Sequence, residues 1–314
     1  MRTLLVGAGK TGVEYLRVLQ GVDMGEVDVL ASSQRNKDAC HRNGAGRFLT
    51  WESKIPWADF ERIIVCVPIE KTPEILNAIV QRTEAPILFE KPGFLSKGQL
   101  LNFVERHPEA RSRAYVAFNR IFFQSIQATK DLISKSDVVA AQSDMTEWVR
   151  NLDVRSYSPF VLARWGISNS IHMISVMFYL FPELKLERRH RIAGSKYSWH
   201  PSGDTFSGVC SIGQSEVFLQ YRAKWIGAGR YSLNIDFREF SVRLWPLDTL
   251  VKITEYTKEE QYPIPVDAYK PGFYHMVEDF LGTRSMLKAY CNLGCLEKCI
   301  QMAEDMFFYD SEYS

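Results

Sequence analysis

The stretch Arg2-Thr-Leu-Leu-Val-Gly-Ala-Gly-Lys-Thr-Gly12 decides the fold, because a short apolar strand runs directly into three glycines. Apolar residues then recur at helical spacing up to Leu19. Gly-x-Gly-x-x-Gly between a strand and a helix is the fingerprint of a dinucleotide-binding βαβ unit. The first glycine permits the tight turn, the second lets backbone approach a pyrophosphate, and the third lets helix and strand pack closely. We expect these residues to contact the phosphates at the helix N-terminus: Gly7, Gly9, Lys10, Thr11 and Gly12.

The end of the second strand, residues 27–31, bears on the choice of cofactor. It runs into Ser32-Ser33-Gln34-Arg35, with no acidic residue at that point. Proteins that prefer NAD commonly place a carboxylate there to bind the ribose 2′-hydroxyl. Hydroxyls followed by an arginine suit a 2′-phosphate instead, since a guanidinium pairs with phosphate oxygens. We therefore predict that Ser32, Ser33 and Arg35 contact the cofactor, with NADP preferred over NAD.

Strands and helices alternate through the first 121 residues. Further strands are expected at 62–67, 86–89 and 114–118, with helices at 72–81 and 96–105 between them. The run at 62–67 is almost wholly apolar, which is typical of a strand buried on both faces. This alternation predicts an α/β fold with a doubly wound parallel sheet, the Rossmann arrangement, over residues 1–121.

The pattern changes after residue 122. Strand-like segments come closer together, one strongly apolar helix is expected at 169–181, and two helices close the chain near 273–281 and 293–308. We predict a second domain of the α+β class over residues 122–314, with an open, mainly antiparallel sheet that binds substrate and pairs with another copy.

Bulk composition excludes several classes of protein. The 314 residues carry a formal net charge of +1, so no strong field selects nucleic acid or an anionic membrane. We expect no secretory signal, no membrane span and a cytoplasmic location. Of the six cysteines, Cys291, Cys295 and Cys299 recur every four residues, which predicts a buried helix face rather than a metal site.

Four features together resemble the glucose–fructose oxidoreductase / inositol dehydrogenase (Gfo/Idh/MocA) family over nearly the whole chain. They are the glycine turn, Glu90-Lys91-Pro92, Asn119-Arg120 and His172. Glu-Lys-Pro directly after a strand is the most specific of them. The resemblance implies a Rossmann domain followed by an open-faced sheet domain, and a sugar, polyol or sugar nucleotide as substrate.

The resemblance places Lys91 near the nicotinamide and the reacting hydroxyl, as a catalytic residue that also binds cofactor and substrate. Burial beside a cationic ring disfavours an ammonium ion, so such a lysine can exchange a proton near neutral pH. By the same resemblance, further residues at strand ends face the cofactor. These are Val67, Pro68, Glu90 and Asn119.

His172 is the second expected catalytic residue, but its surroundings depart from the family pattern. The family places an aspartate four residues before the histidine and often another three after it; this chain has Ser168 and Ser175. A serine cannot serve as a base unless it is activated. We expect Arg164, Ser168 and Asn169 to contact substrate together with Lys91 and His172.

The sequence thus predicts an NAD(P)-dependent oxidoreductase that acts on a carbohydrate-like alcohol or ketone. Asn169-Ser170-x-His172 resembles family members associated with surface-polysaccharide biosynthesis. Two alternatives stay open: a dinucleotide-binding sensor that has lost turnover, and an imine or tetrapyrrole reductase of the same fold. As partners we expect a small carbohydrate-like molecule and further copies of this chain in a homodimer or homotetramer.

Overall fold

The computed structural model describes residues 1–22, 25–192, 196–214, 216–229, 231–255 and 258–309. The chain divides into two compact units: unit 1 comprises Met1–Phe118 and Asp267–Glu297, and unit 2 comprises Asn119–Val266 and Lys298–Ser314. The first break lies close to the boundary expected at residue 121. The segment Asp267–Glu297, however, returns to unit 1, whereas the sequence pattern grouped it with residues 122–314.

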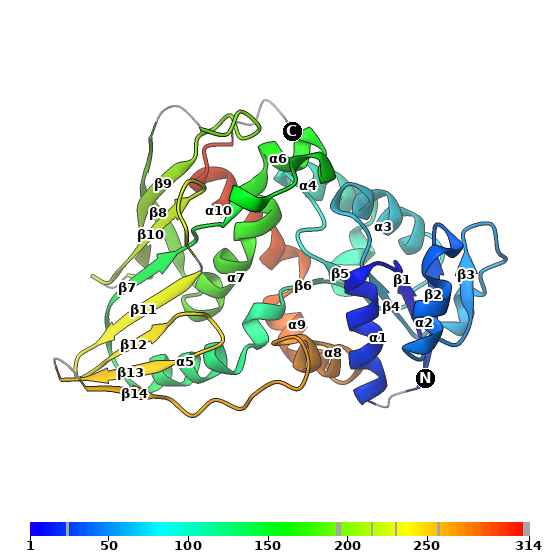
Figure 1. Ribbon diagram of the computed structural model, residues 1–314, viewed down its shortest axis with the longest axis horizontal. Coiled ribbons are helices and arrows are strands. Elements are labelled where there is room, and N and C mark those ends of the chain that lie inside the picture. The colour runs from blue at the N-terminus through cyan, green and yellow to red at the C-terminus, as the bar shows by residue number, and fades with distance from the viewer. Residues whose placement is uncertain (23–24, 193–195, 215, 230, 256–257, 310–314) are drawn as a thin grey trace. The chain divides into compact units, whose positions relative to one another are not determined.

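Unit 1 contains a six-stranded parallel sheet in the order β3-β2-β1-β4-β5-β6, which confirms the predicted doubly wound sheet (Figure 1). Its central strands are buried almost without interruption, as expected for strands covered on both faces. The strand order reverses between β1 and β4, and in such sheets ligands bind beyond the carboxyl ends of the strands at this point. The strands are β1 (Arg2–Val6), β2 (Glu26–Ala31), β3 (Phe48–Thr50), β4 (Arg62–Val65), β5 (Ile87–Glu90) and β6 (Ala114–Ala117).

Right-handed crossovers place helices on both faces of this sheet. The crossovers from β1 to β3 and from β4 to β6 run in opposite directions, so α1 and α2 lie on one face and α3 and α4 on the other. The helices are α1 (Lys10–Val22), α2 (Lys37–Arg42), α3 (Thr72–Val80) and α4 (Lys97–Arg106).

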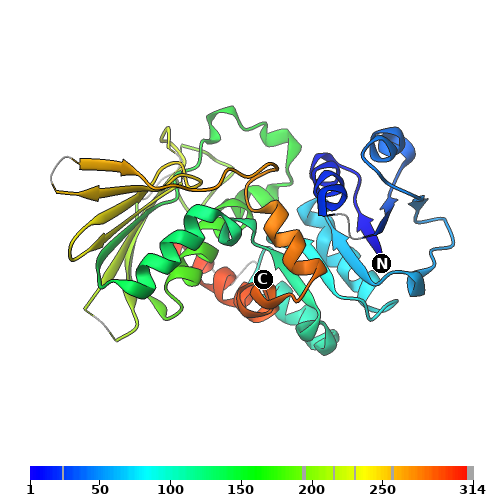
Figure 2. The same cartoon turned by 90° about the horizontal axis from the view of Figure 1, so that it is seen from below.

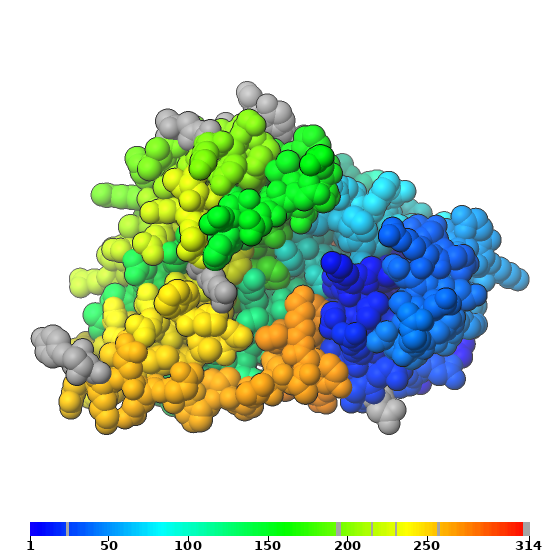
Figure 3. Space-filling model, viewed as in Figure 1, coloured from blue at the N-terminus to red at the C-terminus, as the bar shows by residue number. Residues whose placement is uncertain are grey.

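The returning segment of unit 1 forms α8 (Phe273–Leu281) and α9 (Ser285–Tyr290). Helix α8 packs against α1, and the rings of Tyr15 and Phe273 lie 5.1 Å apart between centroids. In the space-filling view this orange segment lies directly against the blue α1 (Figure 3). Cys291 ends α9 and does not share a helix with Cys295 and Cys299, so the predicted single face of three thiols is wrong.

Unit 2 contains an eight-stranded sheet in the order β14-β13-β12-β11-β7-β10-β9-β8. Among the described strands of this sheet, only β7 and β10 run parallel; the other neighbours are antiparallel, as predicted for a mainly antiparallel sheet. The strands are β7 (Val138–Asp144), β8 (Leu184–Arg191), β9 (Thr205–Ile212), β10 (Phe218–Lys224), β11 (Ser232–Phe237), β12 (Ser241–Leu244), β13 (Val251–Thr254) and β14 (Lys258–Gln261).

The helices of unit 2 cover one face of this sheet, as both cartoon views show (Figure 1 and Figure 2). Accordingly, buried and exposed residues alternate along β10. The helices are α5 (Gln124–Lys135), α6 (Pro159–Ala163) and α7 (Ile171–Leu180), and α10 (Leu293–Met306) begins in unit 1 and ends in unit 2. Over the residues described, no helix has the length and apolar character required to cross a bilayer.

The predicted apolar helix at 169–181 begins differently from the expectation. Residues Gly166–Ser170 form a π-helical turn, and the α-helix starts only at Ile171. A single π turn of this kind is rare and occurs frequently at functional sites.

Candidate functional site

A cavity of about 530 Å³ lies in unit 1 at the carboxyl ends of β1, β2 and β4. This is the edge where the strand order reverses, the place at which doubly wound sheets bind nucleotides. The cavity is lined by Val6, Gly7, Ala8, Gly9, Leu30, Ala31, Ser32, Ser33, Asn36, Trp51, Cys66, Val67, Pro68, Lys71, Glu74, Ile75 and Ala78.

The three glycines of the turn occupy different environments. Gly7 has a φ of +112°, and a Cβ there would lie 2.4 Å from the carbonyl oxygen of Cys66. A Cβ on Gly12 would lie 2.3 Å from the carbonyl oxygen of Gly7, so this glycine lets α1 pack against the turn. Among the residues that the structure describes, a Cβ on Gly9 would meet nothing within 4 Å. The open space over Gly9, beside the N-terminus of α1, fits a pyrophosphate that approaches the backbone closely.

Ser32 and Ser33, which were predicted to contact the ribose end of a cofactor, line the cavity where β2 ends. Arg35 follows in the short helix Gln34–Asn36 and is exposed rather than part of the lining. Asn36, which sequence reasoning missed, lines the cavity and donates a hydrogen bond from Nδ2 to the carbonyl oxygen of Ala8 at 2.7 Å. This bond ties the loop after β2 to the glycine turn.

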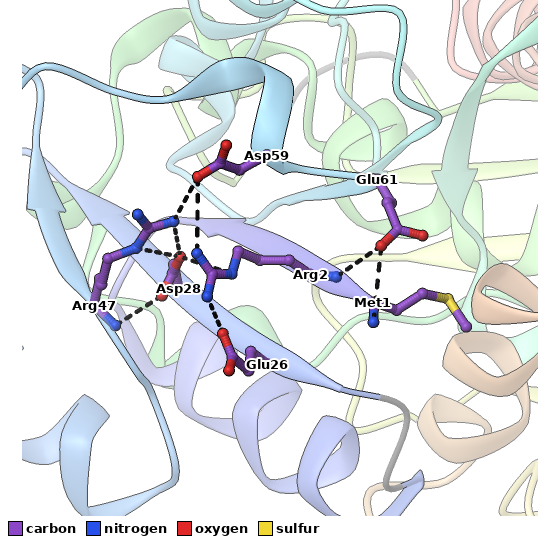
Figure 4. Close-up of polar contacts among 7 residues, drawn as sticks. All are labelled: Met1, Arg2, Glu26, Asp28, Arg47, Asp59 and Glu61. Atoms are coloured by element: carbon purple, nitrogen blue, oxygen red, sulfur yellow. Dashed lines mark hydrogen bonds and ion pairs between the residues drawn. The ribbon is translucent and has the colours of Figure 1, made fainter.

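Asp28, the buried acidic residue of β2, takes part in a network of charges (Figure 4). Its carboxylate accepts hydrogen bonds from the backbone and the Nε of Arg47 at 2.7 and 2.8 Å. The guanidinium of Arg2 lies 3.9 Å from it, and Asp59 contacts both arginines. Asp28 is therefore engaged in structural ion pairs and does not line the cavity.

Three further lining residues were not predicted. Lys71 and Glu74 form an ion pair of 3.3 Å at the start of α3. Trp51 follows β3, a strand of three residues that was itself not predicted, and its ring lies 6.3 Å from that of Trp57. Lys71 could have been predicted as a lining residue, because the loop that begins at Pro68 follows a buried strand and such loops border the nucleotide site of a doubly wound sheet.

The Glu90-Lys91-Pro92 motif ends β5, and the peptide bond between Lys91 and Pro92 is cis. Glu90 Oε1 accepts a hydrogen bond from the hydroxyl of Tyr15 on α1 at 2.7 Å. Burial raises the pKa of the Glu90 carboxyl, and the hydrogen bond from Tyr15 and the ammonium groups of Lys91 and Lys270 lower it in part. The motif is thus anchored to α1, and Glu90 is placed as a support for the lysine that follows it.

Only some of the predicted cofactor residues line the cavity. Gly7, Gly9, Ser32, Ser33, Val67 and Pro68 do so. Asn119 belongs to unit 2, where it begins the short helix Asn119–Phe122. The lining does not include Lys10, Thr11, Gly12, Arg35, Glu90, Lys91 or Asn119, whose contacts with cofactor stay predictions.

His172 lies in the first turn of α7 in unit 2. Ser168 is fully buried in the π turn before it, where its Oγ donates to the carbonyl oxygen of Trp165 at 3.2 Å and accepts from Asn169 Nδ2 at 3.2 Å. Ser175 Oγ donates to the carbonyl oxygen of His172 at 2.9 Å. The Ser168 hydroxyl is thus bonded to a backbone carbonyl and to the side-chain amide of its neighbour, and the Ser175 hydroxyl to a backbone carbonyl of α7. Because Ser168 is in a π turn, it does not stand one regular α-helical turn before His172.

Arg164 is buried and packs on aromatic rings. Its Cζ lies 5.1 Å from the ring centroid of Tyr309 and 5.9 Å from that of Phe160. Its predicted contact with substrate is not tested by these packing contacts and stays a prediction.

A polar cluster near the start of α7 was missed. The guanidinium of Arg120 lies 4.1 Å from the ring centroid of Tyr231, and Tyr231 donates a hydrogen bond to Glu147. Ser170, two residues before His172, contacts the same carboxylate oxygen at 3.4 Å. Burial lowers the pKa of Arg120 to about 10, with the charge of Glu147 acting in the opposite direction. Asn119-Arg120 was noticed in the sequence, but only Asn119 was given a role.

Comparisons with known proteins bear on the fold. No protein-family model matches the sequence, and no curated protein matches it. Among solved structures, UDP-N-acetylglucosamine 3-dehydrogenase GnnA from Acidithiobacillus ferrooxidans is 12% identical, with 98% of this chain and 97% of that chain covered and a TM-score of 0.75. The dehydrogenase MviM from Clostridium difficile is 14% identical, with 99% of each chain covered and a TM-score of 0.77.

An oxidoreductase from Agrobacterium radiobacter, solved in complex with NAD+, L-tartaric acid and magnesium, is 12% identical. It covers 100% of this chain and 97% of its own, with a TM-score of 0.72. These similar structures are oxidoreductases of the Gfo/Idh/MocA type, and the chain shares their fold over its whole length.

Proposed function

We propose that this chain, which has the fold of Gfo/Idh/MocA-type oxidoreductases, is an NAD(P)-dependent dehydrogenase or reductase of a carbohydrate-like alcohol or ketone. The observation that carries the proposal is the cavity over the glycine turn. The turn beneath it requires glycine at Gly7, and the packing of α1 requires glycine at Gly12. The space over the third glycine, Gly9, is open. A dinucleotide pyrophosphate is the ligand that uses such a turn.

Residues of the cavity would hold the cofactor at two places. The backbone of Gly7–Gly9 and the N-terminus of α1 would bind the pyrophosphate, and Ser32, Ser33 and Arg35 the ribose end. Arg35 supports a preference for NADP, since its exposed guanidinium is able to pair with a 2′-phosphate and Asp28 is already held by Arg47. When bound, the cofactor supplies the nicotinamide that exchanges a hydride with substrate.

Lys91 and His172 are the groups proposed to exchange the hydroxyl proton of the substrate. Lys91 is anchored through Glu90 and Tyr15, and His172 lies in the first turn of α7. A positioned acid or base of this kind contributes a factor of about 10² to 10⁴ to the rate.

The substrate class is inferred from the polar cluster beside His172. Arg120, Glu147, Tyr231 and Ser170 offer a cation, a carboxylate and hydroxyl groups within one small region of unit 2. Such a mixture suits a polyhydroxylated molecule that presents several donors and acceptors. The structurally similar GnnA is named as a dehydrogenase of a nucleotide sugar, and a sugar or nucleotide sugar of polysaccharide biosynthesis is the substrate we propose to test first.

A specific observation favours a second function. Ser168 is buried and bonded to backbone where the family has a carboxylate, so a chain that binds the dinucleotide without turnover would be a sensor. An imine reductase is the third candidate, since reduction of an imine does not require that carboxylate.

The experiment uses the full chain with NADPH, NADP, NADH and NAD, and glucose, UDP-N-acetylglucosamine and a cyclic imine as substrates. Absorbance of the reduced nicotinamide measures turnover. We expect turnover on a sugar that Lys91→Ala and His172→Ala each lower by about 10²-fold or more. Lys97→Ala and His190→Ala, outside the cavity, are matched controls. Turnover on the imine alone would identify a reductase, and binding without turnover a sensor.

We also propose that the uncovered face of the unit 2 sheet pairs two copies of the chain. Phe218 lies on the exposed side of β10 and is itself 49% exposed. Large apolar side chains at an open sheet face commonly mark an interface. Light scattering should show a dimer or tetramer; a monomer at micromolar concentration would contradict this.

A further inference from the structure

The π turn ahead of His172 begins at an amide that a distant side chain satisfies. Helix α6 closes with the N–H of Arg164, which bonds to the carbonyl oxygens of Phe160 and Val161 at 3.2 Å each. The N–H of Gly166 then leaves the helix pattern and donates to the hydroxyl oxygen of Tyr309 at 2.7 Å. A buried amide that loses its acceptor is costly, so this hydroxyl favours the turn at this position.

Tyr309 is in turn held by a buried histidine. His200 Nε2 lies 2.8 Å from the Tyr309 hydroxyl, and Nδ1 lies 2.5 Å from the carbonyl oxygen of Gly203. A carbonyl only accepts, so Nδ1 carries the proton and Nε2 accepts from Tyr309. Two longer contacts also reach Nδ1, from the indole nitrogen of Trp225 at 3.2 Å and the hydroxyl oxygen of Ser202 at 3.3 Å.

These hydrogen bonds form a series in which every donor points the same way. The Gly166 N–H donates to Tyr309, Tyr309 donates to His200 Nε2, and His200 Nδ1 donates to Gly203. Burial lowers the pKa of His200 to about 4, so the imidazole is neutral at neutral pH, which is the form that this series of hydrogen bonds needs.

Packing leaves the turn little freedom to move away. A Cβ on Gly166 would lie 2.3 Å from the ring of Phe307. Phe307 stacks on Trp225 with ring centroids 5.6 Å apart, and Arg164 lies over the ring of Tyr309. Only glycine therefore fits at the first position of the turn, because Phe307, which directly follows α10, occupies the space that a side chain would need.

We infer that Tyr309 is a positioning residue: through Gly166 it sets the π turn that carries Ser168 and Asn169 and leads into His172. The role of His172 in turnover rests on the proposed function. The control of the turn by Tyr309 does not rest on the proposed function, and hydrogen exchange of the turn measures it directly.

The test compares Tyr309→Phe with Tyr221→Phe. The first keeps the ring but removes the acceptor of Gly166 and the donor to His200. The second removes a buried hydroxyl that has no hydrogen-bond partner among the residues described. Hydrogen exchange followed by mass spectrometry should show amides of residues 166–172 exchanging about 10- to 100-fold faster in Tyr309→Phe alone, with those of β10 unchanged.

A second readout is the ¹⁵N shift of His200, which should change at Nε2 in Tyr309→Phe. If the chain turns over a substrate, kcat should fall in this variant while the Kd for NADPH stays unchanged. Equal exchange in the two variants, or faster exchange spread evenly through unit 2, would overturn the inference. The exchange result stands even if no substrate is found, so it is separable from failure of the proposed function.

If Tyr309→Phe does not fold, two variants of His200 replace it. His200→Gln keeps an oxygen that can accept from Tyr309, and His200→Leu does not. Protection of residues 166–172 should survive in the first and fall in the second. Equal protection in both would overturn the inference.

Discussion

The variant Gly9→Ala should separate cofactor binding from folding. In the protein without ligand, the added methyl group meets nothing within 4 Å, and Gly9 is not among the glycines of positive φ. The carbonyl oxygen of Gly9 accepts the N–H of Val13 at 3.1 Å, which makes Gly9 the cap of α1. Alanine is a poorer cap than glycine by at most about 1 kcal/mol. The melting temperature should therefore fall by about 4 °C or less.

Binding should respond much more strongly than stability. The methyl group would occupy the space through which a pyrophosphate approaches the backbone, and overpacking of this kind costs about 1–3 kcal/mol. The Kd for NADPH should rise about 5- to 150-fold. Titration of NADPH fluorescence measures the Kd, and thermal unfolding of the same sample measures stability.

Gly12→Ala is the matched comparison, since its Cβ would lie 2.3 Å from the carbonyl oxygen of Gly7. It should lose stability as well as binding, because backbone must shift to admit the methyl group. If Gly9→Ala binds NADPH within twofold of the unsubstituted chain, the pyrophosphate does not lie over Gly9 and the assignment of the cavity is refuted.

Three further predictions concern the cofactor, the charge network and pH. Arg35→Ala should weaken NADP about tenfold and leave NAD unchanged, and an equal effect on both would contradict the predicted 2′-phosphate contact. Asp28→Asn should lower the free energy of unfolding by about 1.5 kcal/mol in urea, because it removes the buried charge that accepts from Arg47 and leaves that arginine with Asp59; a loss below about 0.5 kcal/mol would contradict this. The native pKa of His200 is lowered to about 4 from its ordinary value of 6.5, so the unfolded chain binds the proton first as pH falls. Stability should therefore decline by up to about 3 kcal/mol between pH 6.5 and 4, and His200→Gln, which cannot take up this proton, should remove that part of the decline.

Local patterns predicted unit 1 well. The apolar strand, the glycine turn and the helical spacing after it are neighbours in sequence, so they predict β1, the turn and α1 directly. Residues that follow β2 and β4 line one cavity, because parallel strands all present their carboxyl ends at one edge. The three-residue strand β3 was missed, and Trp51 with it, since so short a segment has no periodicity to detect.

Charge concealed other elements of unit 2. Strand β8 carries Arg188-Arg189 and was not predicted as a strand, and both arginines are exposed. It lies at the end of its sheet, where charged side chains are typical because they discourage further pairing. Strands β13 and β14 were missed as well, and β14 is exposed along its length.

By itself, the sequence determined the dinucleotide turn, the alternation that builds the parallel sheet, and the identity of the residues at its strand ends. These features depend on backbone freedom and on apolar periods of a few residues, which are local properties. Only the tertiary structure decided that Asp267–Glu297 returns to α1, that Glu90 is held by Tyr15, and that a π turn precedes His172. Each depends on contacts between residues far apart in sequence, such as Gly166 and Tyr309. The sequence does not indicate which distant group a given hydroxyl or amide will bond.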